Sequence, residues 1–556
     1  MKRILLSIVC MAVLAVVGCG GKKGEQQQFE QFLGDHVAKI TPLFKEMNLA
    51  SWQAANSGKD QDYNKFAELQ IKVRQLYSDK KDFSFLKKVK ESGRITDSLL
   101  ARQLDKLYNS YLENQIDPAL MKKIVELSTK LEKDFSTFRG TLEGRKVTDN
   151  QIRDILKTEL DSDKRKAAWE TSKQVGEVVA ADLIKLVKLR NEAARKVGFD
   201  NYHTLSLTLG EQDVKELDRI FNELSKLTEQ PFVKLKIELD KKLAEKYGIE
   251  VDQLMPWHYH DPFFQESPLV YDLNLDLYYE SKDVKELATK FYAGIGLPID
   301  SILANSDLYD REGKNPHAFC ADIDREGDIR ILCNLRNNEQ WMETILHESG
   351  HGVYDKYMDP NMPYLLREPA HTFTTEAIAM IFGRLSRNAL WMKDMLGLSD
   401  QQASEIADIS SKYLQLKQLI FARWVMVMYN FEKELYANPD QDLNKLWWDM
   451  VVRYQFVGRP ENRDKPDWAA KIHFTIAPCY YHNYALGELL ASQLHNKIVT
   501  QILKDENKSY VNQKGVGNYL KIIVFRKGAL LHWNDMIENA TGEKLTAKYF
   551  VEQFVD

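Results

Sequence analysis

The chain has 556 residues, of which 44% are hydrophobic, so it could bury one very large core or fold as about two to four domains. It carries 76 Lys and Arg residues against 81 Asp and Glu residues, which gives a formal charge of -5. No basic stripe stands out along it, and we therefore exclude nucleic acid as a partner.

The first residues have the layout of an export signal. A Lys-Arg pair precedes an apolar run over residues 4–17, which is too short to span a bilayer. Residues 16–19, Val-Val-Gly-Cys, resemble the bacterial lipobox, in which the Cys is lipidated and becomes the first mature residue. We therefore expect residues 1–18 to be a lipoprotein signal peptide and Cys19 to anchor an exported protein to a membrane, facing the periplasm or the cell surface. An ordinary signal peptide cut nearby and an uncleaved anchor are the alternatives.

The next segments favour a tether followed by one long folded module. Residues 19–28 are polar and rich in glycine, so we expect a flexible tether there. From residue 29 to about 250 the pattern is helical and charged, with apolar side chains at helical spacing. One such stripe consists of Leu217, Ile220, Phe221, Leu224 and Leu227. The stripes indicate core faces, and we expect residues 29–556 to form a single module.

A cluster of polar side chains follows the helical region. Residues 255–268 include His258, His260 and Asp261, which could form a second metal site. A loop of aromatic residues packed near a cleft would explain the same composition. We favour the loop, because no further ligand cluster accompanies these three residues.

Residues 317–335 change from helical to alternating periodicity. Apolar positions alternate on both sides of residues 325–328, Arg-Glu-Gly-Asp, which predicts a β-hairpin. An extended peptide could add itself to the edge of such a strand through backbone hydrogen bonds, although a purely structural hairpin is the alternative. Cys320 and Cys333 flank the turn and could pair in an oxidising compartment or remain free thiols.

Residues 341–352 contain the pattern H-E-x-x-H within a partly apolar helical segment. His347 and His351 are four positions apart, so both imidazoles face one side of a helix and can bind one zinc ion. Glu348 projects beside the open coordination position. Two histidines on a helix surface would show the same spacing by chance, and a third ligand is needed to exclude that alternative.

Glu376 is the candidate third ligand. It lies twenty-five positions after His351 and opens a second segment with helical apolar periodicity. A catalytic zinc takes three protein ligands and a water molecule, and a carboxylate from a second helix would complete the set. The spacing therefore predicts a catalytic zinc site.

Residues 471–495 bring three tyrosines and several histidines together. A Tyr hydroxyl and a His N–H can donate to the oxyanion that develops when a peptide carbonyl is attacked, each typically contributing about 3 to 4 kcal/mol. An aromatic helix start is more often part of a core, so the segment gains this role only beside a zinc site.

The chain resembles the angiotensin-converting enzyme family of zinc peptidases. Leu366-Arg367-Glu368 and Thr375-Glu376-Ala377-Ile378 match the family's run from H-E-x-x-H to its glutamate ligand. Segments 167–170, 189–199, 446–448 and 453–455 are similar to it as well. The resemblance implies a mostly α gluzincin-type fold with two helical subdomains around a deep channel and a small β-hairpin beside the active site. Residues of about 29–110 would form lid helices.

The resemblance also implies roles for individual residues. Zinc would be bound by His347, His351 and Glu376, with Glu348 as the general base and general acid. The oxyanion would be stabilised by Tyr484 and His473. The substrate would be held by His317, Ala318, Lys471 and Tyr481, with Lys471 binding its terminal carboxylate. The family places a disulfide near the hairpin, but Pro316 occupies the position of its first Cys, so the bond cannot be transferred to this chain.

The chain departs from the family pattern at three positions. Met380 replaces an Asp one turn after the glutamate ligand, so another residue must orient a zinc ligand. Asn483 replaces an Arg that binds chloride, which argues against chloride activation. A Gln that helps to hold the terminal carboxylate is replaced near Tyr259, which weakens the case for strict dipeptide release.

These residues predict a zinc peptidase that hydrolyses short peptides and releases C-terminal dipeptides. Residues 478–487 also look like the oligoendopeptidase and thimet oligopeptidase family, which makes internal cleavage the alternative specificity. A lipoprotein that only binds peptides is an alternative of another class. The intact zinc ligands and Glu348 argue against it, because a binding protein needs no general base.

Overall fold

The computed structural model describes residues 2–268, 270 and 274–555, with side chains from residue 24 onward. Helices dominate, and in these ranges the strands form two separate antiparallel pairs. The predicted mostly helical fold and the predicted hairpin are both confirmed. A second hairpin, formed by β1 (Gly140–Leu142) and β2 (Arg145–Val147), has no counterpart in the sequence predictions.

The first four helices form a layer with its own hydrophobic core. They are α1 (Lys2–Ser57), α2 (Asp60–Tyr77), α3 (Lys80–Ser92) and α4 (Ser98–Glu113). Their buried side chains form a cluster distinct from the main core, and Tyr364 and Leu365 from the main body pack into it. We call this layer the lid layer, because it covers the residues predicted to form a lid.

Charged contacts join the lid layer to the main body. On α4, Arg102 pairs with Glu211, and Lys106 Nζ lies 2.7 Å from Glu368 Oε1. On α1, Lys45 Nζ lies 3.0 Å from Asp324 Oδ2. The lid layer is therefore held by its own apolar core internally and by several ion pairs at its border.

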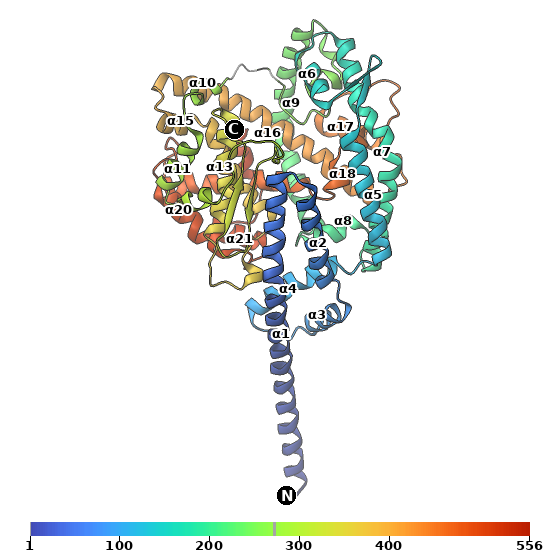
Figure 1. The fold of residues 1–556 in the computed structure, drawn as a ribbon, viewed down its shortest axis with the longest axis vertical. Coiled ribbons are helices and arrows are strands. Elements are labelled where there is room, and N and C mark those ends of the chain that lie inside the picture. The colour runs from blue at the N-terminus through green and yellow to red at the C-terminus, as the bar shows by residue number, and fades with distance from the viewer. Residues whose placement is uncertain (1, 269, 271–273, 556) are drawn as a thin grey trace.

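The N-terminal part of α1 projects alone from the body, away from the other helices (Figure 1). Phe29 is the earliest buried side chain of the described part. The predicted signal peptide at residues 1–18 and the lipidation of Cys19 concern side chains outside the described set, so both stay predictions. Residues 19–28, expected to be a flexible tether, continue α1 as helix. Among the residues that the structure describes, no helix combines the length and the apolar character needed to cross a membrane.

The rest of the chain folds around one continuous hydrophobic core. One half contains α5 (Pro118–Thr137), α6 (Asp149–Thr158), α7 (Ser162–Lys196), α8 (Tyr202–Leu209), α9 (Val214–Tyr247), α17 (Leu443–Gln455) and α18 (His473–Ile476). The other half contains α10 (Asp276–Tyr279), α11 (Val284–Gly294), α12 (Asp300–Ala304), α13 (Glu339–Lys356), α14 (Thr372–Gly383), α15 (Ala389–Leu396), α19 (His482–Lys497), α20 (Lys514–Tyr519), α21 (Trp533–Thr541) and α22 (Lys548–Phe554). The long helix α16 (Asp400–Ala437) crosses from one half to the other (Figure 1).

Helices α13 and α14 pack closely enough to share one site. A Cβ atom built on Gly350 of α13 would lie only 2.8 Å from the Cα atom of Ala379 of α14. Any larger residue at that position would therefore push the two helices apart. Gly350, the second x of H-E-x-x-H, thus allows the close packing that puts Glu376 of α14 over the two histidines of α13.

The hairpin before α13 consists of β3 (Phe319–Asp322) and β4 (Ile329–Leu332). Phe319 pairs with Leu332 and Asp322 with Ile329, so the strands are antiparallel. Arg325 and Gly327 adopt positive φ angles of 58° and 112° in the connecting turn, where glycine relieves the strain at the second position. The turn falls on the predicted residues 325–328.

Candidate active site

The three predicted zinc ligands meet between α13 and α14. His347 Nε2 lies 3.5 Å from Glu376 Oε1, and His351 Nε2 lies 3.6 Å from Glu376 Oε2. Zinc bonds of 2.0 to 2.2 Å in a tetrahedron put neighbouring ligand atoms about 3.4 Å apart. One ligand atom from each of the three residues lies within 4.8 Å of the others. The donor set and its spacing therefore fit a zinc ion.

Burial shapes the protonation of this group. It lowers the pKa of both imidazoles, that of His351 to about 3, so their nitrogen lone pairs are available as ligands. Burial, together with the negative charge of Glu376, raises the pKa of Glu348 to about 8, opposed by a hydrogen bond from the Cys320 backbone. A bound dication would favour the ionised carboxylates.

Thr375 orients one zinc ligand. His351 Nδ1 lies 2.8 Å from Thr375 Oγ1, so an Nδ1–H group donates to the hydroxyl and leaves Nε2 free to face the metal position. Met380, which stands where the family has an Asp, supplies no such group. The sequence predicts that another residue orients a zinc ligand, and in the structure Thr375, next to the ligand Glu376, contacts His351.

We expect Thr375→Val to weaken zinc binding by about 10- to 100-fold, because it removes the hydrogen bond that fixes the His351 imidazole. Competition with a chelator measures the zinc affinity. Thr372→Val is the matched control, since Thr372 is exposed on the same helix. Equal zinc affinity in both variants would contradict the orienting role.

The zinc ligands line a cavity of about 580 Å³, which we call the strand cavity because β3 forms part of its wall. Ala318 and Cys320 lie on this wall, and Asn48 of α1 lines the cavity as well. Within the described residues β3 pairs only with β4, and its residues Phe319, Cys320 and Asp322 line the cavity. His317, in contrast, is exposed. Of the two predicted substrate-binding residues at the hairpin, the structure brings Ala318 to the site and leaves His317 on the surface.

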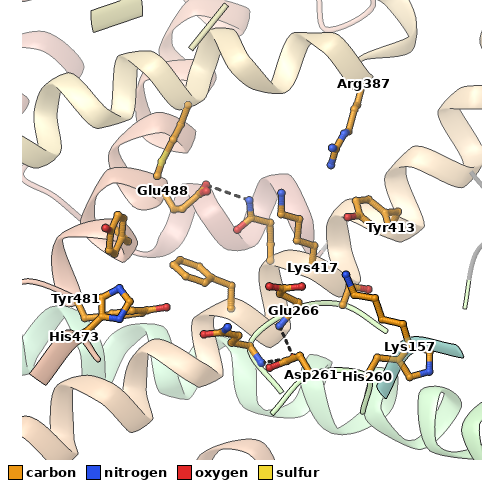
Figure 2. Close-up of a pocket in the computed structure, with 16 residues that line it drawn as sticks. Lys157, His260, Asp261, Glu266, Arg387, Tyr413, Lys417, His473, Tyr481 and Glu488 are labelled. Atoms are coloured by element: carbon orange, nitrogen blue, oxygen red, sulfur yellow. Dashed lines mark hydrogen bonds between the residues drawn. The ribbon is translucent and has the colours of Figure 1, made fainter. Parts of the chain in front are cut away.

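A second cavity of about 620 Å³ contains the predicted oxyanion residues, and we call it the tyrosine cavity. Tyr481, Tyr484 and His473 line it, and Figure 2 shows Tyr481 and His473 together at one end. The Tyr481 ring lies 4.9 Å from the His473 ring and 5.3 Å from the Tyr484 ring. The negative charge of Glu376 contributes to a raised pKa of Tyr484, after burial and Tyr480. The predicted catalytic tyrosine therefore lies within electrostatic reach of a zinc ligand.

His473 can donate to a ligand in this cavity. Its Nδ1 atom is buried and has no hydrogen-bond partner among the described residues. Burial lowers the pKa of His473 to about 4, so the imidazole is neutral and carries a single N–H. A buried imidazole nitrogen without a partner is what an oxyanion donor should look like before substrate binds.

Lys471 lies in an aromatic enclosure beside the tyrosine cavity. Its Nζ atom is 5.0 Å from the Trp424 ring centroid, 5.2 Å from that of Tyr481 and 5.4 Å from that of Phe263. It donates a hydrogen bond to Gln265 Oε1. Burial lowers the pKa of this ammonium to about 8. A cation fixed this way can bind a carboxylate without losing much side-chain entropy.

Gln265 makes a contact with Lys471 that the sequence pattern does not predict. Tyr259, near which the sequence lacks the family's glutamine, is buried and bonds Lys236 and Asp240. Gln265 lies six residues later and supplies an amide to the same lysine. The side chain of Asp261 accepts hydrogen bonds from the Gln265 and Phe263 backbones, which shapes the loop.

The possible second metal site has other partners. His258 Nδ1 accepts a hydrogen bond from the Met255 backbone, and its Nε2 lies 3.0 Å from Ser162 Oγ. Asp261 holds its own loop, as described above. In the described part of the chain, the His, Cys, Asp and Glu side chains grouped closely enough to hold a metal ion are His347, His351 and Glu376.

Two further positions bear on the sequence predictions. Asn483, where the family has a chloride-binding Arg, accepts a 2.8 Å hydrogen bond from Gln212 Nε2, and Gln212 in turn contacts His482. A buried amide network therefore occupies this position. Cys320 and Cys333, for which the sequence allows either a disulfide or free thiols, are both free.

The site joins two imidazoles, a ligand carboxylate and a second glutamate on paired helices, with a strand edge and oxyanion donors nearby. This combination defines a zinc-dependent peptidase of the H-E-x-x-H type.

Comparison with known proteins agrees with this class. Angiotensin-converting enzyme of Theromyzon tessulatum is 22% identical over 494 residues, which are 82% of this chain and 79% of that protein. Carboxypeptidase 1 of Bacillus subtilis is 23% identical over 298 residues, 48% of this chain and 56% of that protein. Oligopeptidase PepF of Bacillus subtilis is 23% identical over 367 residues, 64% of this chain and 50% of that protein. The chain spans about half the length of these two Bacillus relatives.

The family model described as Peptidase M2, Angiotensin-converting enzyme, matches residues 23–260 and 270–555. The chain therefore belongs to the angiotensin-converting enzyme family and is a zinc metallopeptidase.

Proposed function

We propose that the enzyme is a dipeptidyl carboxypeptidase that releases C-terminal dipeptides from short peptides. The observation that carries this proposal is the Lys471 ammonium, held by Gln265 among aromatic rings next to Tyr481 and His473. A buried cation beside a substrate cavity suits the carboxylate of a free C-terminus. Its fixed position would set how many residues follow the scissile bond.

The residues of the chain have distinct tasks in this reaction. His347, His351 and Glu376 would hold a zinc ion, which when bound would act as a Lewis acid and lower the pKa of water. Glu348 takes the proton from the attacking water and later passes it to the leaving amine. The hydrogen bond from the Cys320 backbone positions the Glu348 carboxylate for both transfers.

The remaining groups bind the substrate. Tyr484 donates to the developing oxyanion, assisted by the neutral His473 imidazole. The backbone at Ala318, directly before β3, pairs with the extended peptide. The Tyr481 hydroxyl accepts a 2.8 Å hydrogen bond from Trp424 Nε1 and donates its own proton to the terminal carboxylate of the substrate.

We expect Lys471→Met to raise KM for peptides with a free C-terminus by about 30-fold or more, because an enclosed charge pair is lost. Hydrolysis of N-blocked peptides with free and amidated C-termini, followed by mass spectrometry, measures the effect. The unchanged enzyme should release dipeptides from the free acids and cleave the amides poorly.

Two controls sharpen this test. Lys465→Met removes a lysine that is paired on the surface with Glu177, and its KM should stay unchanged.

The pKa of Lys471 near 8 also predicts that KM for free acids rises as the pH increases through about 8, because the ammonium loses its proton. Lys471→Met should lack this dependence. Equal cleavage of acids and amides by the unchanged enzyme would contradict dipeptidyl specificity.

Internal cleavage of longer peptides is the second candidate function. A third cavity of about 640 Å³ is lined by Lys471 itself, and Gln265 and His473 line both this cavity and the tyrosine cavity. This space leaves room for a chain that continues past the lysine. Products cut internally from amidated peptides would favour this oligopeptidase specificity, which one of the Bacillus relatives has in its name.

The proposed setting of the enzyme rests on the sequence. The lipobox-like residues 16–19 support an exported lipoprotein that is anchored through Cys19 and acts on peptides outside the cytoplasm. The projection of the N-terminal part of α1 from the body is compatible with such an anchor (Figure 1).

A further inference from the structure

Asp355 has no partner in the substrate-binding region. It lies on α13, one helical turn after the zinc ligand His351, and its side chain lines the strand cavity. Among the described residues it makes no side-chain hydrogen bond or ion pair. Burial raises the pKa of this carboxyl well above its usual range. Asp355 is half-buried, so its carboxyl without a partner remains open to a ligand that enters the cavity.

A second carboxylate faces the same space. Asp322, at the end of β3, lines the strand cavity, and its negative charge contributes to the raised pKa of Asp355. It accepts hydrogen bonds from the backbones of Asp324 and Arg325 in the hairpin turn, at 3.3 Å and 2.8 Å. These two carboxylates come from different elements and converge on one wall of the cavity.

The arginines of the strand cavity make their hydrogen bonds with partners other than Asp355 and Asp322. Arg325 donates to Glu368 Oε2 at 3.0 Å, and Glu368 also pairs with Lys106 of the lid layer. Arg367 donates to the Met362 carbonyl at 2.7 Å. A zinc ion would balance its own ligand carboxylate. Arg325 lowers the pKa of both Asp355 and Asp322 while it pairs with Glu368, so this one cation is shared among three carboxyl groups that line the cavity.

The position of this wall fixes which part of a peptide it meets. In the proposed function the free C-terminus binds Lys471, beside the tyrosine cavity, and the inference rests on that proposal. The strand cavity then holds the residues on the N-terminal side of the scissile bond, which extend along β3. Any side chain or terminus that reaches Asp355 belongs to this part of the substrate.

We propose that Asp355, together with Asp322, forms a subsite that binds a substrate cation on the N-terminal side of the scissile bond. The cation is an ammonium or guanidinium group, supplied either by a Lys or Arg side chain or by the free α-amine of a short peptide. The enzyme would thus prefer basic peptides, with an acidic wall before the scissile bond and a cationic anchor after it.

Peptides that differ only in this charge test the proposal. One series keeps the C-terminal dipeptide constant and places Lys, Arg, Gln or Glu at each of the two positions before the scissile bond, with the N-terminus acetylated. A second series compares free and acetylated N-termini on the neutral peptide. We expect kcat/KM to be about tenfold higher for the cationic member of the preferred pair. The series that shows the effect identifies the side chain or the α-amine as the source.

Two variants and a control assign the preference to the proposed residues. Asp355→Asn should bring the ratio of cationic to neutral kcat/KM close to one, and Asp322→Asn should lower it while keeping a side-chain oxygen for the turn. Asp408→Asn, an exposed change on α16, should leave the ratio unaltered. A preserved ratio in Asp355→Asn overturns the proposal. If that variant does not fold, equal kcat/KM for Lys and Glu peptides in the unchanged enzyme overturns it instead.

The neutral Gln peptide separates this inference from the proposed function. If the unchanged enzyme removes the dipeptide from it as fast as from the Lys, Arg and free-amine peptides, the charge preference fails and the dipeptidyl function stands. If peptides are cleaved at internal positions regardless of their C-terminus, the dipeptidyl function fails. A binding assay with Glu348→Gln and the same peptides then still reports whether Asp355→Asn weakens binding of the cationic members.

Discussion

Replacing Glu348 with Gln is expected to lower kcat by about 10²- to 10⁴-fold while zinc binding is retained. The amide is nearly isosteric with the carboxylate but cannot take a proton from water or return it to the leaving amine. Glu348 does not belong to the three-residue ligand group, so the metal position should survive the change. Turnover of a chromogenic peptide and the metal content of the same sample measure the two quantities.

Glu343→Gln provides the control, because Glu343 lies on the same helix and pairs with Arg387 instead of facing the strand cavity. That variant should keep most of its activity. Full turnover in Glu348→Gln with bound zinc would exclude Glu348 as the general base. Loss of zinc together with activity would show that the change disturbed the ligands and not the proton transfer.

Replacing Tyr484 with Phe is expected to lower kcat by about 10²- to 10³-fold with little change in KM, because the hydroxyl donates to charge that develops only in the transition state. The ring itself packs against Tyr481 and remains in place. Steady-state kinetics on one good substrate give both parameters. A change confined to KM would indicate that the hydroxyl only binds the ground state.

Tyr480→Phe is the matched control for this experiment. The Tyr480 ring lies 5.4 Å from the Tyr484 ring, and it is a neighbouring hydroxyl on the same segment. Removing it should have little effect on kcat. Similar losses in both variants would point to a disturbed aromatic cluster and not to a missing oxyanion donor.

The zinc ligands could be predicted from sequence because helical periodicity determines the positions of His347 and His351 relative to each other. Glu376 followed from its own helical segment and from the resemblance. The hairpin at 317–335 was also predictable, since alternating apolar residues flank a turn that contains a glycine. The helix and the hairpin are local signals, whereas the link between Glu376 and the two histidines spans twenty-five positions and depended on zinc chemistry and on the resemblance.

The remaining features depend on contacts between distant segments. Gln265 and Lys471 are more than two hundred residues apart in the sequence, and the local pattern around either residue does not predict their contact. Asp355 lacks a partner because of the residues that surround it in the folded cavity, and the helical periodicity of α13 does not predict this. The β1–β2 hairpin did leave a local signal, the pair Glu143-Gly144 with positive φ angles at its turn, but its strands are only three residues long.

The lid layer has a thermodynamic consequence. Opening of the layer would expose the apolar contacts that Tyr364 and Leu365 of the main body make with its core, but it would leave the rest of that separate core intact. The work of opening also includes separating ion pairs such as Lys106 with Glu368 and Lys45 with Asp324. Such contacts contribute little individually and are screened by salt. Raising the ionic strength should therefore make the lid layer easier to open.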